Sequence, residues 1–262
     1  MNFKKRKKII AVIREGHSDY CVIKHLIVSI FKCHCSVELQ EDNFFEFESL
    51  NISQSLQKYL ATARRENDYS RYSDHAEELK DRIFQVLHTA LGKISKETEI
   101  PLSNQDVLIL SADTELVLDP NNRKRDDIIK ATISKLESVI WLAVEDFYDR
   151  MVTYCYSYTD LPLVLPLVLF PSSEILVASC MYDFRQQNFR ALRPKPDLKQ
   201  KVYETDNIPE AFESGKLEEV LSMYVVPEKL DRVYRAIPEA RKLIQILSYC
   251  SPAGKVRAAE CG

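Results

Sequence analysis

The segment Lys8–Tyr20 (KIIAVIREGHSDY) restricts the fold of this 262-residue chain more than any other stretch. Ile9–Ile13 is a short apolar run with β-branched residues, bounded by charge on both sides, and it predicts a buried strand. Glu15-Gly16 follows as a tight turn, and Ser18 is a suitable N-cap for a helix with apolar residues at helical spacing. In open α/β sheets, ligands bind where strands end beside helix N-termini, so Glu15 and Asp19 stand where such folds place their chemistry.

Three later segments continue this pattern of strands. Asp106–Ser111 is a clear strand, and Leu163–Phe170 is continuously apolar, as expected of a strand covered on both faces. Ser36–Phe47 is a strand with softer boundaries, because its glutamates expose part of it. The helices that apolar periodicity predicts cover residues 18–32, 51–65, 74–95, 126–150, 174–182, 209–214, 217–224, 227–236 and 238–250. The order predicts an α/β fold with a mainly parallel central sheet and helices on both faces.

The same pattern suggests two parts. Residues 1–183 form the α/β domain, with a helical insertion at about 51–103 that exceeds a simple crossover. Phe184–Asn207 is a connection rich in arginine, lysine and proline. Residues 184–262 form a C-terminal helical extension packed on the domain.

Composition excludes several classes of protein. A net charge of −3 and a pI of about 6.0 do not indicate a globally basic nucleic-acid binder. Only 5 glycines and no GxxxxGK[ST] motif argue against a glycine-rich phosphate loop. Seven scattered cysteines indicate reduced thiols and a cytoplasmic protein. No apolar run reaches membrane-spanning length, and the five apolar residues after the N-terminal basic cluster are too few for a signal peptide.

Acidic residues follow three of the predicted strands. Glu15 and Asp19 follow the first, Asp113 and Glu115 the strand at 106–111, and Glu174 the strand at 163–170. Because parallel strands end at one rim of a sheet, these acids are expected to lie close together, where each raises its neighbour's pKa unless a cation compensates the charge. Mg²⁺ uses such carboxylates together with substrate phosphate oxygens. Acids are also common at helix starts, where they interact with the helix N-terminus. For any one of these acids taken singly, ordinary helix capping is therefore an alternative explanation.

These acids fall in motifs that resemble those of the Toprim family. EGHSD at Glu15–Asp19 resembles its first motif, and the spacing to Asp19 matches the OLD-like branch. LILSADTE resembles the Asp-x-Asp motif at Asp113, although Glu115 stands where the family has aspartate. LFPSSEILVASCMYD is similar to a segment of small defence-associated Toprim-like nucleases, which adds Glu174.

The resemblance implies a Toprim-like fold and a nuclease dependent on Mg²⁺ or Mn²⁺. Glu15 would be the general base or acid, and Glu15, Asp19, Asp113, Glu115 and Glu174 would hold metal. The substrate would be DNA or RNA, tRNA included. An ATPase partner and a role in anti-phage defence are also implied, and a homodimer is left open.

A basic-aromatic segment follows the acid at 174. Arginines and lysines alternate there with Phe184 and Phe189, which suits phosphate contact, although a solvated loop with two prolines fits equally well. The family resemblance adds a catalytic lysine in this region, which is Lys195 or Lys199, and we take Lys199.

Two functions follow from these residues. The first is a metal-dependent nuclease that hydrolyses phosphodiesters. The alternative is a catalytically silent Toprim-like module that binds a partner, which the substitution at Glu115, the acidic pI and the added helices favour.

Overall fold

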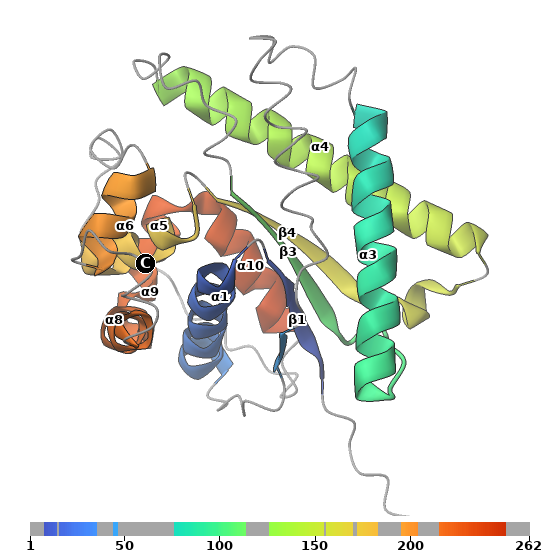
Figure 1. Ribbon diagram of the computed structural model, residues 1–262, viewed down its shortest axis with the longest axis horizontal. Helices are drawn as coiled ribbons and strands as arrows, with labels where there is room; N and C mark the ends of the chain where they lie inside the picture. The colour runs from blue at the N-terminus through green and yellow to red at the C-terminus, as the bar shows by residue number, and fades with distance from the viewer. Residues whose placement is uncertain are drawn as a thin grey trace, which may run out of the picture. The chain divides into compact units, whose positions relative to one another are not determined.

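The computed structural model describes residues 8–14, 16–35, 44–46, 76–113, 126–154, 156–169, 172–182, 195–203 and 215–249 (Figure 1). The chain divides into two compact units. The first unit comprises Met1–Glu15 with Gln40–Val168, and the second comprises Gly16–Leu39 with Leu169–Gly262. Each unit is therefore built from two separate parts of the sequence.

The first unit is built on an open sheet, which confirms the predicted α/β class. Its strands are β1 (Ile10–Ile13), β2 (Phe44–Glu46), β3 (Val107–Asp113) and β4 (Leu163–Leu169). They lie in the order β2-β1-β3-β4. β1 pairs in parallel with both β2 and β3, so the predicted parallel pairing is confirmed for these three strands.

Continuous apolar sequence explains why these segments are strands. Every residue of β1 and of β3 is buried. Because both faces of these strands are covered, their sequences are mostly apolar and do not alternate between apolar and polar residues along their whole length. On one face Ala11 and Leu108 belong to a core shared with the helices α3 (Ala76–Thr98) and α4 (Asp126–Thr153). The helices predicted at 74–95 and 126–150 are therefore present, with slightly later ends, whereas the one predicted at 51–65 lies outside the described residues.

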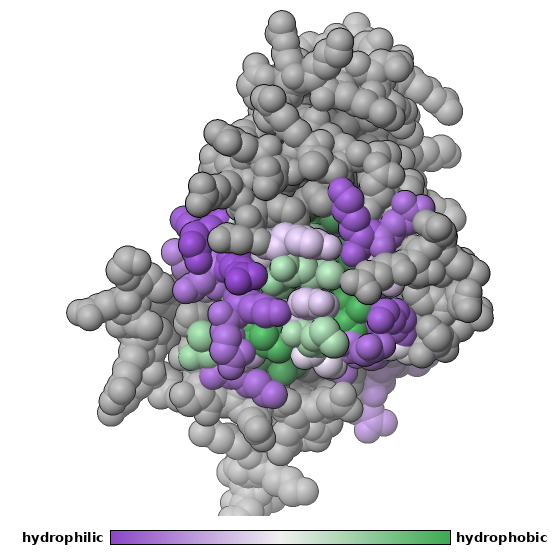
Figure 2. All heavy atoms as spheres, turned by 90° about the vertical axis from the view of Figure 1, so that its left-hand side faces the viewer, coloured by the Kyte–Doolittle hydropathy of each residue, from purple (hydrophilic) through white to green (hydrophobic). Residues whose placement is uncertain are grey.

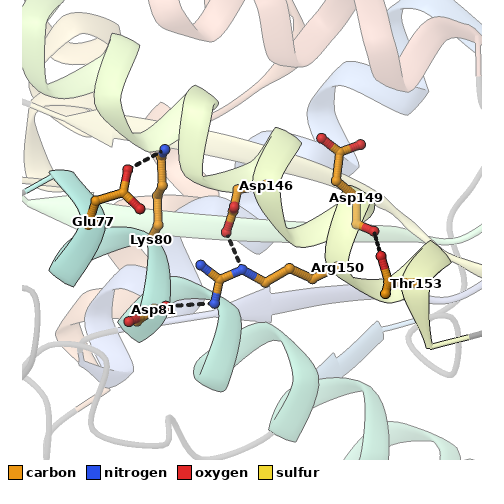
Figure 3. A network of polar contacts seen from close by, with 7 residues as sticks. All are labelled: Glu77, Lys80, Asp81, Asp146, Asp149, Arg150 and Thr153. Carbon is orange, nitrogen blue, oxygen red and sulfur yellow. Dashed lines mark hydrogen bonds and ion pairs between the residues drawn. The ribbon is translucent and has the colours of Figure 1, made fainter.

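Polar side chains join α3 to α4 outside this core (Figure 3). Arg150 of α4 contacts Asp81 of α3 at 2.6 Å and Asp146 of its own helix at 2.7 Å. The guanidinium also lies 5.3 Å from the centre of the Phe84 ring. Because Arg150 is one-third exposed, these contacts orient the two helices and add little to stability.

The hydroxyl of Tyr148 ties α4 to the start of β4. It donates to the carbonyl of Pro162 and accepts from the backbone N–H of Val164, both at 2.8 Å. Burial raises the pKa of Tyr148 above its ordinary value of 10.0, and the N–H of Val164 opposes this rise. The hydroxyl therefore stays protonated at neutral pH and can serve as donor and acceptor together.

Replacing Tyr148 with phenylalanine is expected to lower the free energy of unfolding by about 1–2 kcal/mol at pH 7, because Val164 N–H loses its acceptor. A raised folded-state pKa contributes stability that is full below pH 10.0 and is lost as the pH rises through the folded value, so the deficit of Y148F should shrink in alkali. Urea denaturation at pH 7 and above pH 10 measures both effects. Tyr154→Phe, at a residue that is 63% exposed, is the matched control and should change little.

The second unit is helical. Its elements are α1 (His17–Ile30), a π-helical turn η1 (Phe31–Cys35), α5 (Glu174–Met181), α6 (Lys195–Tyr203), α8 (Lys216–Tyr224), the short turn η8 (Pro227–Lys229), α9 (Leu230–Ala236) and α10 (Pro238–Tyr249). Most match the predicted helices, and the helix predicted at 209–214 lies outside the described residues. In Figure 2, apolar residues gather near the middle of one face, with polar residues around them.

Helix α6 corrects the prediction that 184–207 is only a connection. Pro196 stands in the first turn of α6, where proline is tolerated because the N–H it lacks has no partner within the helix. Leu198, Val202 and Tyr203 are each fully buried, and their spacing gives the helix one inward face. Burial of three side chains thus outweighs a sequence that is otherwise polar and charged.

The two compact units also differ from the division expected at residue 183. Helices α1 and α5, which the sequence assigns to the first domain, cluster with the C-terminal helices. α5 contacts α6, α8 and α9, and α1 contacts α8. One such contact is the hydroxyl of Ser29, which donates to the carbonyl of Val225 at 2.7 Å.

No helix in the described part of the chain is both long enough and apolar enough to span a membrane.

Candidate functional site

The start of α1 holds the first candidate carboxylate, Asp19. Gly16 precedes the helix in extended conformation, and its N–H donates to Oδ2 of Asp19 at 2.8 Å. This bond satisfies a backbone donor before the first turn, and the helix N-terminus favours the negative charge. Asp19 is nevertheless only 5% exposed, which is unusual for an acid whose sole role is capping.

Two serines at the start of α5 bind two carboxylates. The hydroxyl of Ser173 donates to Oδ1 of Asp19 in a short hydrogen bond across 154 positions of sequence. The hydroxyl of Ser172 donates to Oε2 of Glu174 at 2.5 Å. Both serines and Glu174 are completely buried. Adjacent residues of one turn therefore connect Asp19 and Glu174 into a single polar cluster.

Helix α6 completes this cluster with a cation and a phenol. Lys199 Nζ lies 3.3 Å from Oε1 of Glu174, and the hydroxyl of Tyr203 donates to the same oxygen at 3.5 Å. Lys199 and Tyr203 are four residues apart, so they project from the same face of α6. Burial raises the pKa of Tyr203 far above its ordinary value, and the charges of Glu174 and Asp19 raise it further. The phenol therefore remains a donor toward Glu174.

We name Asp19, Ser172, Ser173, Glu174, Lys199 and Tyr203 the Glu174 cluster. It brings together three of the residues singled out from the sequence, Asp19, Glu174 and Lys199, all within the second unit.

The other predicted residues are not part of this cluster as the structure describes it. Asp113 belongs to the first unit, where it is the last residue of β3 and is 4% exposed. Glu15 and Glu115 lie outside the described residues, as does the side chain of Lys195, the alternative to Lys199. The predicted convergence of all five acids on one cation therefore stays a prediction.

The chemistry of the donor set suits a hard divalent cation. The described donors are carboxylate and hydroxyl oxygens, which Mg²⁺ and Mn²⁺ prefer over nitrogen or sulfur. Two carboxylates alone do not make a complete site, and no group of three His, Cys, Asp or Glu within the described ranges is arranged to hold a metal ion. Asp19 and Glu174 have the right ligand chemistry for such a cation, but by themselves they do not form a complete site.

The cysteine and histidine side chains of α1 and α5 make contacts of their own. Cys21 Sγ lies 3.5 Å from Nε2 of His17, one turn earlier on α1, and His17 is exposed. Burial raises the pKa of Cys180 to about 12, so that thiol is protonated and unreactive at neutral pH. Cys21, Cys33 and Cys180 form no disulfide in the part of the chain that the structure describes.

Sequence reasoning missed Tyr203 as a member of the cluster. The apolar spacing of Leu198, Val202 and Tyr203 was the available signal, and the two prolines and many charges of the segment obscured it. Ser172 and Ser173 belong to the motif LFPSSEILVASCMYD, but their role as donors to two carboxylates depends on tertiary structure.

Comparison of the chain with protein-family models, with curated proteins and with solved structures gives no match.

Proposed function

We propose that this protein is a metal-dependent nuclease of Toprim-like fold that hydrolyses phosphodiester bonds in DNA or RNA. The observation that carries the proposal is the buried Glu174 cluster, in which adjacent serines bind Asp19 and Glu174 and Lys199 pairs with Glu174. Acidic oxygens of this kind bind Mg²⁺ or Mn²⁺, which when bound activates water and stabilises charge at phosphorus.

Each residue has a stated role in this proposal. Asp19 and Glu174 contribute oxygen ligands, and the serine hydroxyls fix the orientation of both carboxylates. By the family resemblance, Glu15 is the general base or acid, and Asp113 and Glu115 are further metal ligands. Lys199 supplies positive charge for a substrate phosphate. An ATPase partner and a role in anti-phage defence belong to the proposal through the same resemblance.

A cleavage assay tests the proposal directly. Single-stranded DNA, duplex DNA and tRNA are incubated with Mg²⁺ or Mn²⁺ and with wild type, Glu15→Ala, Asp113→Ala or Glu174→Gln. Loss of a metal ligand or of the general base should reduce the rate at least about 100-fold. Glu219→Gln, at an exposed acid of α8, is the matched control and should keep the wild-type rate. Equal cleavage by all of the variants contradicts the assignment of the site.

A catalytically silent partner-binding module is the second candidate, and one observation favours it. Both oxygens of Glu174 already accept hydrogen bonds or an ion pair from protein groups, so the carboxylate is satisfied as a structural element. This alternative expects no Mn²⁺ binding in calorimetry and a stable complex with a partner protein in pull-down. Tight Mn²⁺ binding that Glu174→Gln abolishes argues against it.

A further inference from the structure

We propose that Lys199 and a divalent cation compete for Glu174, so that the Lys199–Glu174 ion pair opens as the metal ion binds. The inference rests on the proposed metal-dependent function and adds a regulatory role for one of its residues. In the metal-free protein Lys199 neutralises the buried carboxylate, and the metal ion replaces it. The site is then already folded in the metal-free protein, and its affinity for the metal ion depends partly on the free energy of breaking the Lys199–Glu174 ion pair.

The crowding of Glu174 is the first reason. Its Oε2 accepts from Ser172, while its Oε1 receives both Lys199 and Tyr203. A carboxylate offers about four lone-pair positions, of which these three contacts use most. A cation that approaches Oε1 therefore needs the position that Lys199 holds. An ammonium and a divalent cation on one oxygen would also repel each other strongly where burial weakens dielectric screening.

The mobility of the two α6 groups decides which of them leaves. Tyr203 is fully buried and its phenol is held in the protonated form, so it has no route to water and remains on Glu174. The Lys199 side chain is 21% exposed and ends a flexible four-carbon stem. Lys199 can therefore turn its ammonium into solvent without unfolding α6, and there it is placed to contact an anionic substrate.

The first test is titration of Mn²⁺ alone into wild type and Lys199→Met by isothermal calorimetry. We expect K199M to bind Mn²⁺ about tenfold more tightly, the factor for a charge-assisted contact that no longer has to be broken. Lys201→Met, on the same helix and exposed, is the matched control and should bind as wild type does. Lys199→Arg keeps the positive charge and should bind Mn²⁺ with the affinity of wild type. If K199M does not fold, the labelling experiment on the unmodified protein still tests the proposal.

The second test uses the unmodified protein. Acetylation of lysines with an amine-reactive ester is followed by mass spectrometry in the presence and absence of Mn²⁺. The rate at Lys199 should rise several-fold when Mn²⁺ is bound, because its ammonium leaves the ion pair, whereas the rate at Lys201 should stay constant. A rate at Lys199 that falls or does not change while Mn²⁺ binds overturns the proposed exchange.

The outcomes separate this inference from the proposed function. If wild type binds Mn²⁺ and K199M binds it equally or more weakly, the competition is wrong and the metal-dependent function stands. If neither wild type nor any variant binds Mn²⁺ at millimolar concentration, the metal site and the competition both fail. Tighter binding by K199M together with increased labelling of Lys199 supports both.

Discussion

Replacing Asp106 with alanine is expected to lower the free energy of unfolding of the first unit by about 3–5 kcal/mol, because two charge-assisted bonds to backbone N–H groups are lost together. Asp106 is 1% exposed. Its Oδ1 accepts from the N–H of Ile9 at 2.9 Å, and its Oδ2 accepts from the N–H of Ser103 at 2.8 Å. Alanine leaves both donors without an acceptor.

The position of Asp106 makes this loss larger than that of an ordinary turn residue. Its backbone carbonyl accepts from Leu163 N–H at 2.8 Å, and the next residue, Val107, donates to the carbonyl of Ile9 at 2.9 Å. Asp106 therefore joins the beginnings of β1, β3 and β4. Removing its carboxylate weakens the point at which three segments, far apart in sequence, start their pairing.

The chain contains its own control for this prediction. Asp160 occupies the same local motif, in which an aspartate accepts from the N–H of the serine three residues earlier, here Ser157 at 3.2 Å. Asp160 is exposed, so water replaces the lost acceptor and Asp160→Ala should cost less than about 1 kcal/mol. Urea denaturation followed by circular dichroism compares the two. A similar loss in both variants would show that burial of Asp106 is not what matters.

The strands were predictable from sequence because few other structures bury a continuous apolar run of this length. The segments at 9–13, 106–111 and 163–170 became β1, β3 and β4 with boundaries shifted by one or two residues. The role of Asp106 was not predictable, because it appeared only as a charged boundary of a strand. Its partner Ile9 is 97 positions away in the sequence. Which residues of two distant strands pair depends on the register of the strands, and the local sequence pattern does not specify that register.

Two of the five acids predicted for the site, Asp19 and Glu174, lie in the cluster, and the residues that contact them were not predicted as their partners. Strand ends and helix starts directed attention to Asp19 and Glu174, which do share a cluster, and the sequence contains no signal that adjacent serines join them. Tyr203 was hidden because a helix of mixed charge with an early proline resembles a loop until its buried face is known. Local propensity is weak where three buried side chains decide the conformation.

Replacing Phe147 with alanine is expected to destabilise the first unit by about 3–5 kcal/mol, the usual range for deleting a buried aromatic ring. Phe147 lies on α4 and is completely buried. Its ring centre is 6.0 Å from that of Phe84 on α3 and 5.5 Å from that of Tyr148, which it meets edge-on. It also belongs to the core that α3 and α4 share with the sheet, so its loss leaves a cavity there.

Leu142→Ala is the matched control for Phe147→Ala, because Leu142 lies on the same helix and is 51% exposed. It should change stability by less than about 0.5 kcal/mol.

Hydrogen exchange measured residue by residue adds a second readout, since F147A and D106A act on one unit through different forces. Both should reduce protection in β1 and β3, the strand that ends at Asp113. If F147A lowered protection only within α4, the helix pair would be an independent layer, and the core would not support the strand that carries this candidate acid.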